Sequence, residues 1–138
     1  MVGICLIGCG RAGMIHARNF AGKVPGARMV AAADPVAAAL AAAQEELGVA
    51  SGYLDYREAL QNPAVDAVVI VSPTKYHREI ALAAAAAGKH ILCEKPMAMD
   101  ERECDDMIAA AELNKVKLHI GFMRRFDESF VAAKQMIE

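Results

Sequence analysis

The stretch ICLIGCGRAGM, residues 4–14, decides the fold class of this chain of 138 residues. A short apolar run, Gly3–Ile7, leads into three glycines, Gly8, Gly10 and Gly13, and a helix-forming segment follows them. This G-x-G-x-x-G spacing between a strand and a helix is typical of dinucleotide-binding domains. The first glycine permits a tight turn, the second lets the backbone approach a pyrophosphate, and the third lets the helix pack closely on the strand. The stretch therefore predicts a dinucleotide-binding α/β domain.

Apolar runs and helix-forming segments alternate along the rest of the chain. The predicted strands are Gly3–Ile7, Ala27–Ala33, Ser51–Tyr53, Asp66–Val71, His90–Cys93 and Lys117–Gly121. The predicted helices span Arg11–Ala21, Pro35–Leu47, a brief turn capped by Asp55, Tyr76–Ala87, a segment from Asp100 to Asn114, and a last segment opened by Asp127. The unbroken apolar sequence DAVVIV indicates a strand buried on both faces. We therefore expect a doubly wound, mostly parallel six-stranded Rossmann sheet that binds ligands at the carboxyl ends of its strands.

An acidic residue, Asp34, ends the second predicted strand about 20 residues past the glycines, where this motif requires one. A carboxylate there accepts hydrogen bonds from both adenosine ribose hydroxyls and repels the 2′-phosphate of NADP. No arginine follows it within the next several residues to receive that phosphate. The sequence thus favours NAD over NADP. Two plainer interpretations remain open: a glycine turn without a ligand, and Asp34 as a helix cap, which is compatible with ribose binding.

Composition excludes several classes of function. The net charge of −2 and the absence of a basic stripe argue against a nucleic-acid partner. No apolar run reaches the roughly 18 residues of a membrane span, and no charged segment precedes the first strand as in a signal peptide. We expect a cytoplasmic protein without a membrane partner. Its four cysteines (Cys5, Cys9, Cys93 and Cys104) form no C-x-x-C pair, so we predict reduced, buried thiols and no metal site.

The sequence CEKP, residues 93–96, follows the fifth predicted strand at the ligand edge. Lys95 at that edge suits a group that polarises a substrate hydroxyl or stabilises an alkoxide. Pro96 restricts the residue before it and so fixes the turn. Taken alone, a lysine at such a position is more often a solvated surface residue.

GCGRAG, ADP, SPTKYH and CEKP together resemble the amino-terminal half of the glucose–fructose oxidoreductase/inositol dehydrogenase/MocA family, over the whole chain. The stretch GFMRRFD, residues 121–127, resembles the myo-inositol 2-dehydrogenase branch in particular. The resemblance implies hydride transfer between NAD and a secondary alcohol of a cyclic polyol or sugar. It implies Lys95 as the catalytic lysine. It also implies cofactor contacts from Gly8, Gly10, Arg11, Ala12, Gly13, Asp34, Ser72, Pro73, Thr74, His77, Glu94, Lys95, Met123 and Arg124.

The same resemblance implies a Rossmann domain over residues 1–125, and residues 126–138 as the start of a helix leading into a substrate domain that is missing here. In the family that domain completes proton transfer with the lysine, so we expect this chain to bind cofactor with little turnover. Of the four histidines, only His77 is predicted at the ligand edge. Thr74 stands where the family often has asparagine, which puts one side-chain contact in doubt.

The last predicted helix carries an apolar face at helical spacing, formed by Phe126, Phe130, Ala133 and Ile137. We expect that face to be partly exposed, or covered by a neighbouring chain in a homo-oligomer. An alternative function is therefore a stand-alone NAD-sensing or partner-binding module in which Lys95 does no chemistry. Another is a different Rossmann nucleotide binder, such as an enzyme that uses S-adenosylmethionine, but CEKP has no role in that hypothesis.

Overall fold

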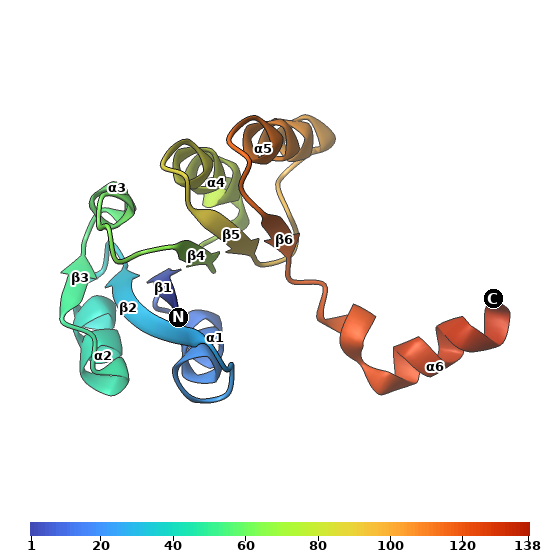
Figure 1. Ribbon diagram of the computed structural model, residues 1–138, viewed down its shortest axis with the longest axis horizontal. Coiled ribbons are helices and arrows are strands. Elements are labelled where there is room, and N and C mark those ends of the chain that lie inside the picture. Colours follow the sequence, from blue (N-terminus) through green and yellow to red (C-terminus); the bar gives the residue numbers. More distant parts are fainter.

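A computed structural model describes all 138 residues and shows one sheet with helices on both faces (Figure 1). The strands are β1 (Val2–Ile7), β2 (Ala27–Ala33), β3 (Ser51–Tyr53), β4 (Ala67–Ile70), β5 (His90–Cys93) and β6 (Leu118–Ile120). All neighbours pair in parallel, in the order β3-β2-β1-β4-β5-β6. The predicted doubly wound, six-stranded sheet is confirmed, and no strand end differs from its prediction by more than one residue.

The helices are α1 (Arg11–Gly22), α2 (Ala37–Leu47), α3 (Tyr56–Leu60), α4 (His77–Ala86), α5 (Glu101–Leu113) and α6 (Glu128–Ile137), with short 3₁₀ turns η1 (Thr74–Tyr76) and η2 (Met123–Phe126). Aspartate side chains accept backbone N–H groups at the starts of α3, α5 and α6, as N-caps do. Gly48, in the left-handed conformation, ends α2. These helix ends follow the local sequence signals that predict them.

The start of α2 differs from its prediction. The sequence places Pro35 at the first helical position, but α2 begins only at Ala37. The Asp34 side chain accepts a hydrogen bond from the Val36 amide, 2.8 Å from Oδ1, and this closes a turn over residues 34–36. The helix begins after that turn, so Asp34 belongs to the loop after β2 and is not the N-cap of α2.

The core lies in two layers, one on each face of the sheet. Because successive side chains of a strand point to opposite faces, Cys5 and Ile7 join one layer while Ile4 and Leu6 join the other. Helices α3, α4 and α5 cover the first face, and α1 and α2 cover the second (Figure 1). Alanines on α4 are fully buried against the sheet, and such small side chains let the helix lie close to the strands.

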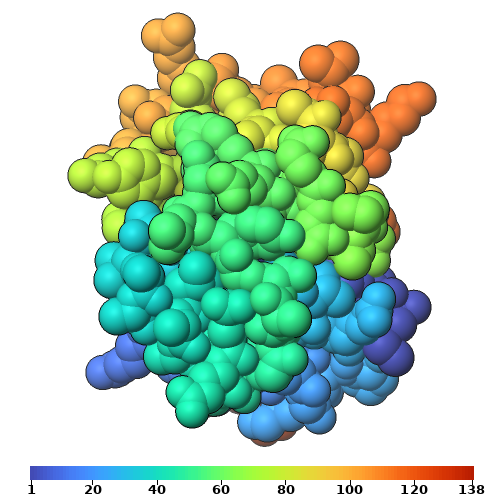
Figure 2. All heavy atoms as spheres, turned by 90° about the vertical axis from the view of Figure 1, so that its left-hand side faces the viewer, coloured from blue at the N-terminus to red at the C-terminus, as the bar shows by residue number.

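Helix α6 extends away from the sheet (Figure 1), and none of its residues is buried. Its apolar side chains are exposed, at 48% for Phe130 and 86% for Ile137, and Phe126 just before it is 70% exposed. The apolar face is therefore exposed in the single chain, and its cover by a neighbouring chain stays a prediction. At the opposite end of the molecule, β3 is the edge strand of the sheet, and the α2–β3–α3 segment forms the surface there (Figure 2). None of the helices has the length and apolar character needed to cross a membrane.

Candidate functional site

The strand order places a topological switch point at the carboxyl edge of the sheet, and we call the region between the loops after β1 and β4 the crevice. Strand β1 leads into α1 on one face, whereas its neighbour β4 leads into α4 on the other face. The two loops therefore diverge, and such a switch point is where open α/β sheets bind ligands. The Val71 amide donates a hydrogen bond to the Ile7 carbonyl (2.8 Å), which holds the ends of β1 and β4 together beneath the crevice.

The three glycines of the first loop have different structural reasons. Gly8 has φ +99°, and a Cβ there would lie 2.6 Å from the Val71 carbonyl oxygen. A Cβ on Gly13 would lie 1.9 Å from the Gly8 carbonyl oxygen. Gly10, in contrast, has an extended conformation open to any residue, and nothing lies within 4 Å of its would-be Cβ. Packing within the chain thus accounts for Gly8 and Gly13, whereas Gly10 borders open space.

That open space lies at the amino end of α1. The first intrahelical bond there is donated by the Met14 amide to the Gly10 carbonyl (3.0 Å), so the amides of Arg11, Ala12 and Gly13 precede it. No side chain caps this end, and its first turn carries no acidic residue. Free N–H groups together with the positive end of the helix dipole favour an anion. The residues therefore fit the pyrophosphate of a dinucleotide.

Asp34 lies beside the glycine turn, held by two backbone amides. Its Oδ2 accepts from the Cys9 amide (2.7 Å) and its Oδ1 from the Val36 amide (2.8 Å). These bonds fix the orientation of the carboxylate, and each oxygen keeps a second lone pair. No salt bridge involves Asp34. A half-buried carboxylate with spare acceptor capacity suits a ribose diol.

The cysteines near the crevice are packing residues. Burial raises the pKa of Cys5, Cys9 and Cys93 to about 12, and each of them gains a smaller rise from a neighbouring acidic group or thiol. Neutral thiols are poor nucleophiles and poor metal ligands. The prediction of buried thiols is confirmed for these three, but it was wrong for Cys104, which is only half-buried on the face of α5.

Glu94, the first residue after β5, is held between two groups. Its Oε1 lies 2.8 Å from Nε2 of His16, and its Oε2 accepts a hydrogen bond from the Lys95 amide (2.9 Å). His16 belongs to α1, so this contact joins α1 to the CEKP loop. The prediction that only His77 lies at the ligand edge was therefore wrong. His16 follows Gly13 by three residues, and that spacing places both on one face of the helix.

Lys95 and the loop after β4 lie on the same edge. The Lys95 side chain is exposed, and its ammonium makes no hydrogen bond or ion pair within the chain. The peptide bond between Lys95 and Pro96 is cis. Ser72 lies against the glycine turn, because its amide nitrogen would be only 3.1 Å from a Cβ on Gly8. Pro73 and Thr74 continue that loop toward α4.

The surroundings of three more predicted cofactor residues are also defined, namely those of His77, Met123 and Arg124. The His77 ring is 1% exposed and faces backbone carbonyls with both nitrogens, so neither nitrogen is free for a ligand. Met123 is 72% exposed in η2, beyond β6. The Arg124 guanidinium lies over the ring of Phe130 on α6, 4.7 Å from its centroid. Met123 is thus exposed on η2, and the Arg124 side chain contacts α6.

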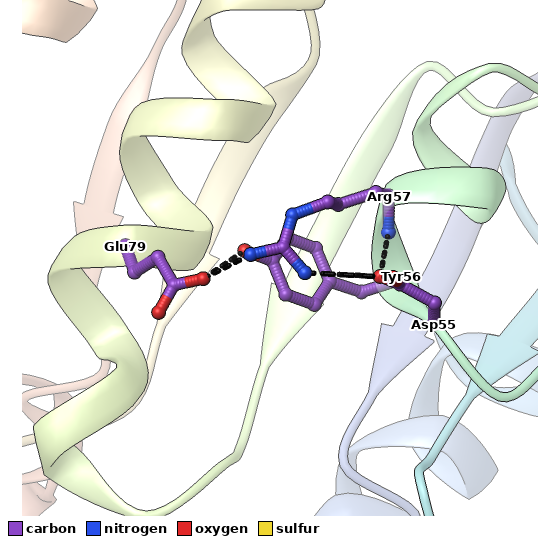
Figure 3. Close-up of polar contacts among 4 residues, drawn as sticks. All are labelled: Asp55, Tyr56, Arg57 and Glu79. Atoms are coloured by element: carbon purple, nitrogen blue, oxygen red, sulfur yellow. Dashed lines mark hydrogen bonds and ion pairs between the residues drawn. The ribbon is translucent and has the colours of Figure 1, made fainter.

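A polar cluster that the sequence did not reveal joins α3 to α4 (Figure 3). The Arg57 guanidinium lies between Asp55 and Glu79 and forms an ion pair with each, and the Tyr56 hydroxyl donates to Glu79 at 2.8 Å. Partial burial, helped by the Glu79 carboxylate, raises the pKa of Tyr56 to about 12. The hydroxyl therefore stays protonated at neutral pH. Because the charged groups are exposed, we interpret the cluster as a weak structural link between the two helices.

Comparison with known proteins agrees with this geometry. The sequence model of the Gfo/Idh/MocA family, described as an oxidoreductase family with an NAD-binding Rossmann fold, matches residues 2–122. The chain is 37% identical over 133 residues to scyllo-inositol 2-dehydrogenase (NAD(+)) of Bacillus subtilis, covering 96% of this chain and 39% of that protein. It is 39% identical over 135 residues to myo-inositol 2-dehydrogenase of Thermotoga maritima, covering 98% and 40%.

Solved structures give the same result. Scyllo-inositol dehydrogenase from Lactobacillus casei, with bound cofactor NAD(H) and scyllo-inositol, superposes with a TM-score of 0.93 at 38% identity. The match covers 99% of this chain and 41% of that one. The chain thus spans about 40% of the length of the relatives it matches.

Proposed function

We propose a function for this chain from its membership of the Gfo/Idh/MocA oxidoreductase family, to which it belongs through its NAD-binding Rossmann domain. The chain holds NAD along the carboxyl edge of its sheet and presents Lys95 to an alcohol substrate. The observation that carries the proposal is the Asp34 carboxylate, oriented by the Cys9 amide beside the uncapped start of α1. This arrangement offers a ribose acceptor next to a pyrophosphate site.

In this proposal the cofactor lies across the crevice. The pyrophosphate is held at Gly8, Gly10 and the amides of Arg11, Ala12 and Gly13, and the adenosine ribose at Asp34. Ser72, Pro73 and Thr74 form a wall of the crevice, and the Glu94 carboxylate lies toward the nicotinamide end. The preference for NAD over NADP rests on charge, because the Asp34 carboxylate would face the 2′-phosphate with no cation paired to it.

The reaction proposed for the whole protein is oxidation of a secondary alcohol of a cyclic polyol, of the inositol type named in its relatives. When bound, NAD supplies the nicotinamide ring that accepts a hydride. The Lys95 ammonium stabilises the negative charge that develops on the hydroxyl oxygen as its proton passes to a base, which the family resemblance assigns to the substrate domain. Glu94 and Pro96 flank Lys95 and define the turn from which its side chain projects.

The 138 residues by themselves are expected to bind cofactor with little turnover. No carboxylate or imidazole of the chain contacts the Lys95 ammonium. No such group is therefore placed to accept the substrate proton by way of Lys95. Orienting the substrate carbon against the nicotinamide supplies a large part of the rate enhancement. Substantial oxidation of myo- or scyllo-inositol by this chain with NAD would contradict this part of the proposal.

A second candidate is an NAD-sensing or partner-binding module, favoured by the exposed apolar side chains of α6. In that case Lys95→Ala leaves the function unchanged. If the chain acts together with a substrate domain, the same change abolishes activity. Association of two copies through α6, and a cytoplasmic location, remain predictions.

The deciding experiment is calorimetric titration of the chain with NAD and, separately, with NADP. We expect saturable binding of NAD, at least tenfold tighter than binding of NADP. Tighter binding of NADP would contradict the role given to Asp34. Absence of binding by either would contradict the proposed cofactor site as a whole.

Gly10→Ala tests whether a pyrophosphate approaches the protein backbone at Gly10. The new methyl group meets no protein atom within 4 Å, so we expect the free energy of unfolding to change by less than about 0.5 kcal/mol. The methyl group would occupy the space in which a pyrophosphate approaches α1. We therefore expect NAD affinity to fall at least about tenfold, which corresponds to a loss of about 1.4 kcal/mol of binding free energy. Urea unfolding and calorimetry measure the two quantities.

Gly22→Ala is the matched control, because Gly22 ends the same helix and its added Cβ also meets open space. It should leave NAD affinity unchanged and raise the free energy of unfolding by at most about 1 kcal/mol, because alanine is the better helix former. Unaltered NAD affinity in Gly10→Ala would show that the ligand does not approach this turn.

A further inference from the structure

His77 is the one polar side chain of the chain that is buried, with 1% of its surface exposed. It begins α4, directly after the 3₁₀ turn that follows the Ser72–Thr74 loop. All the other buried side chains are apolar, apart from neutral thiols. A polar ring in such surroundings is costly unless its nitrogens are paired.

The two ring nitrogens contact two different loops of the carboxyl edge. Nε2 lies 2.8 Å from the carbonyl oxygen of Ser72, in the loop after β4. Nδ1 lies 2.9 Å from the carbonyl oxygen of Pro96, in the loop after β5. Ser72 and Pro96 are 24 residues apart in the sequence. No side chain other than His77 makes hydrogen-bond contacts with the backbone of both loops. The ring thus spans the gap between them.

Both partners are carbonyl oxygens, which only accept hydrogen bonds. A neutral imidazole carries one N–H and donates to one of them, whereas a doubly protonated ring donates to both. In either state, no ring nitrogen remains for a ligand. The His77 ring therefore interacts with the backbone of the two loops and not with a ligand.

We propose that His77 is a positioning residue, whose ring sets the spacing between the cofactor-facing Ser72–Thr74 loop and the Lys95–Pro96 turn. Pro96 directly follows Lys95, so a ring held against the Pro96 carbonyl fixes the base of the lysine side chain. The same ring holds the Ser72 carbonyl and with it the wall of the crevice beside Gly8. This role rests on the proposed function, because it concerns the distance between bound cofactor and Lys95.

The test compares His77→Phe with His77→Gln and with a control, His90→Phe. Phenylalanine fills the space of the ring but donates no hydrogen bond, whereas glutamine keeps an N–H donor. His90 also makes one backbone contact, accepting from the Lys117 amide at 3.0 Å, but it lies at the amino end of β5, away from the crevice. Thermal unfolding of each variant reports whether it folds.

The first readout needs no cofactor. Hydrogen exchange is measured at two amides. The Lys95 amide donates a hydrogen bond to the Glu94 carboxylate, and the Tyr76 amide donates one to the Pro73 carbonyl. The Leu6 amide in the central strand β1 serves as the reference for global opening. We expect His77→Phe to speed exchange about tenfold at Lys95 and Tyr76 relative to Leu6. His77→Gln should recover much of the protection, and His90→Phe should change neither ratio.

The second readout is NAD affinity by calorimetry. We expect a loss of about tenfold in His77→Phe, a smaller loss in His77→Gln and none in His90→Phe. If His77→Phe does not fold, His77→Asn replaces it, because the shorter side chain does not span the two carbonyls, and it should show the same faster exchange. Wild-type exchange ratios in the folded His77→Phe protein, or in His77→Asn where it replaces it, would overturn the proposal. If the unaltered chain binds no NAD, the proposed function fails, whereas the exchange ratios still decide the role of His77.

Discussion

Asp34→Ala is expected to lower the affinity of the chain for NAD about a hundredfold. The change removes the acceptor for the ribose hydroxyls and leaves the Cys9 and Val36 amides without their partner. Hydrogen bonds to a charged group are each worth about 1.5–3 kcal/mol, and a loss of about 3 kcal/mol corresponds to about a hundredfold in affinity. Calorimetric titration with NAD measures it.

Two further variants separate the causes. Asp34→Asn keeps an acceptor oxygen but removes the charge, so it should narrow the preference for NAD over NADP while retaining more NAD affinity than alanine. Asp100→Ala removes the aspartate cap of α5, whose side chain bonds only to the Glu103 amide, and should cost about 1 kcal/mol of stability with no change in affinity. NAD binding by Asp34→Ala at wild-type strength would show that the carboxylate does not hold the cofactor.

Gly13→Ala is expected to destabilise the fold by about 2 kcal/mol and to weaken NAD binding as well. The added Cβ would lie 1.9 Å from the Gly8 carbonyl oxygen and 3.4 Å from the Leu6 side chain. Because the closest atom belongs to the backbone of the tight turn, α1 must shift away from β1. Overpacking of this kind costs about 3 kcal/mol, against a gain of about 1 kcal/mol from alanine in a helix. Urea unfolding measures the difference.

The shift of α1 would also move the amides of Arg11 and Ala12 away from the pyrophosphate position, so affinity should fall together with stability. This separates Gly13→Ala from Gly10→Ala, in which affinity alone should fall. Gly22→Ala on the same helix again serves as the control. A Gly13→Ala protein with wild-type stability would show that the helix and the turn are less closely packed than the structure has them.

The sequence was a good guide to the elements because their signals are local. Strands β1 and β4 are apolar runs followed by turn residues, and the predicted aspartate caps Asp55, Asp100 and Asp127 are found at their helices. Gly8 and Gly13 could be assigned to the turn and to helix packing from spacing alone, and the structure gives the contacts that exclude a Cβ. The start of α2 was missed because the Asp34 side chain forms the turn that delays it.

The candidate site was only partly predictable. The motif order placed Asp34 beside the glycines, but its bond to Cys9, 25 residues away, follows from the register of β1 and β2. The contact between His16 and Glu94 spans 78 residues and has no sequence signal beyond helical spacing. The cofactor roles of Met123 and Arg124 stay predictions, and the contact of the Arg124 guanidinium with Phe130 of α6 had no sequence signal.

By itself the sequence determined the fold class, the order of its elements and the edge of the sheet that holds the candidate site, because periodicity, caps and glycine spacing act over a few neighbouring residues. Only the tertiary structure decided how side chains serve that edge. It turned His77 inward to two carbonyls, joined His16 to Glu94 and left α6 exposed. These outcomes depend on which loops parallel pairing brings together, and a linear sequence does not contain those distances.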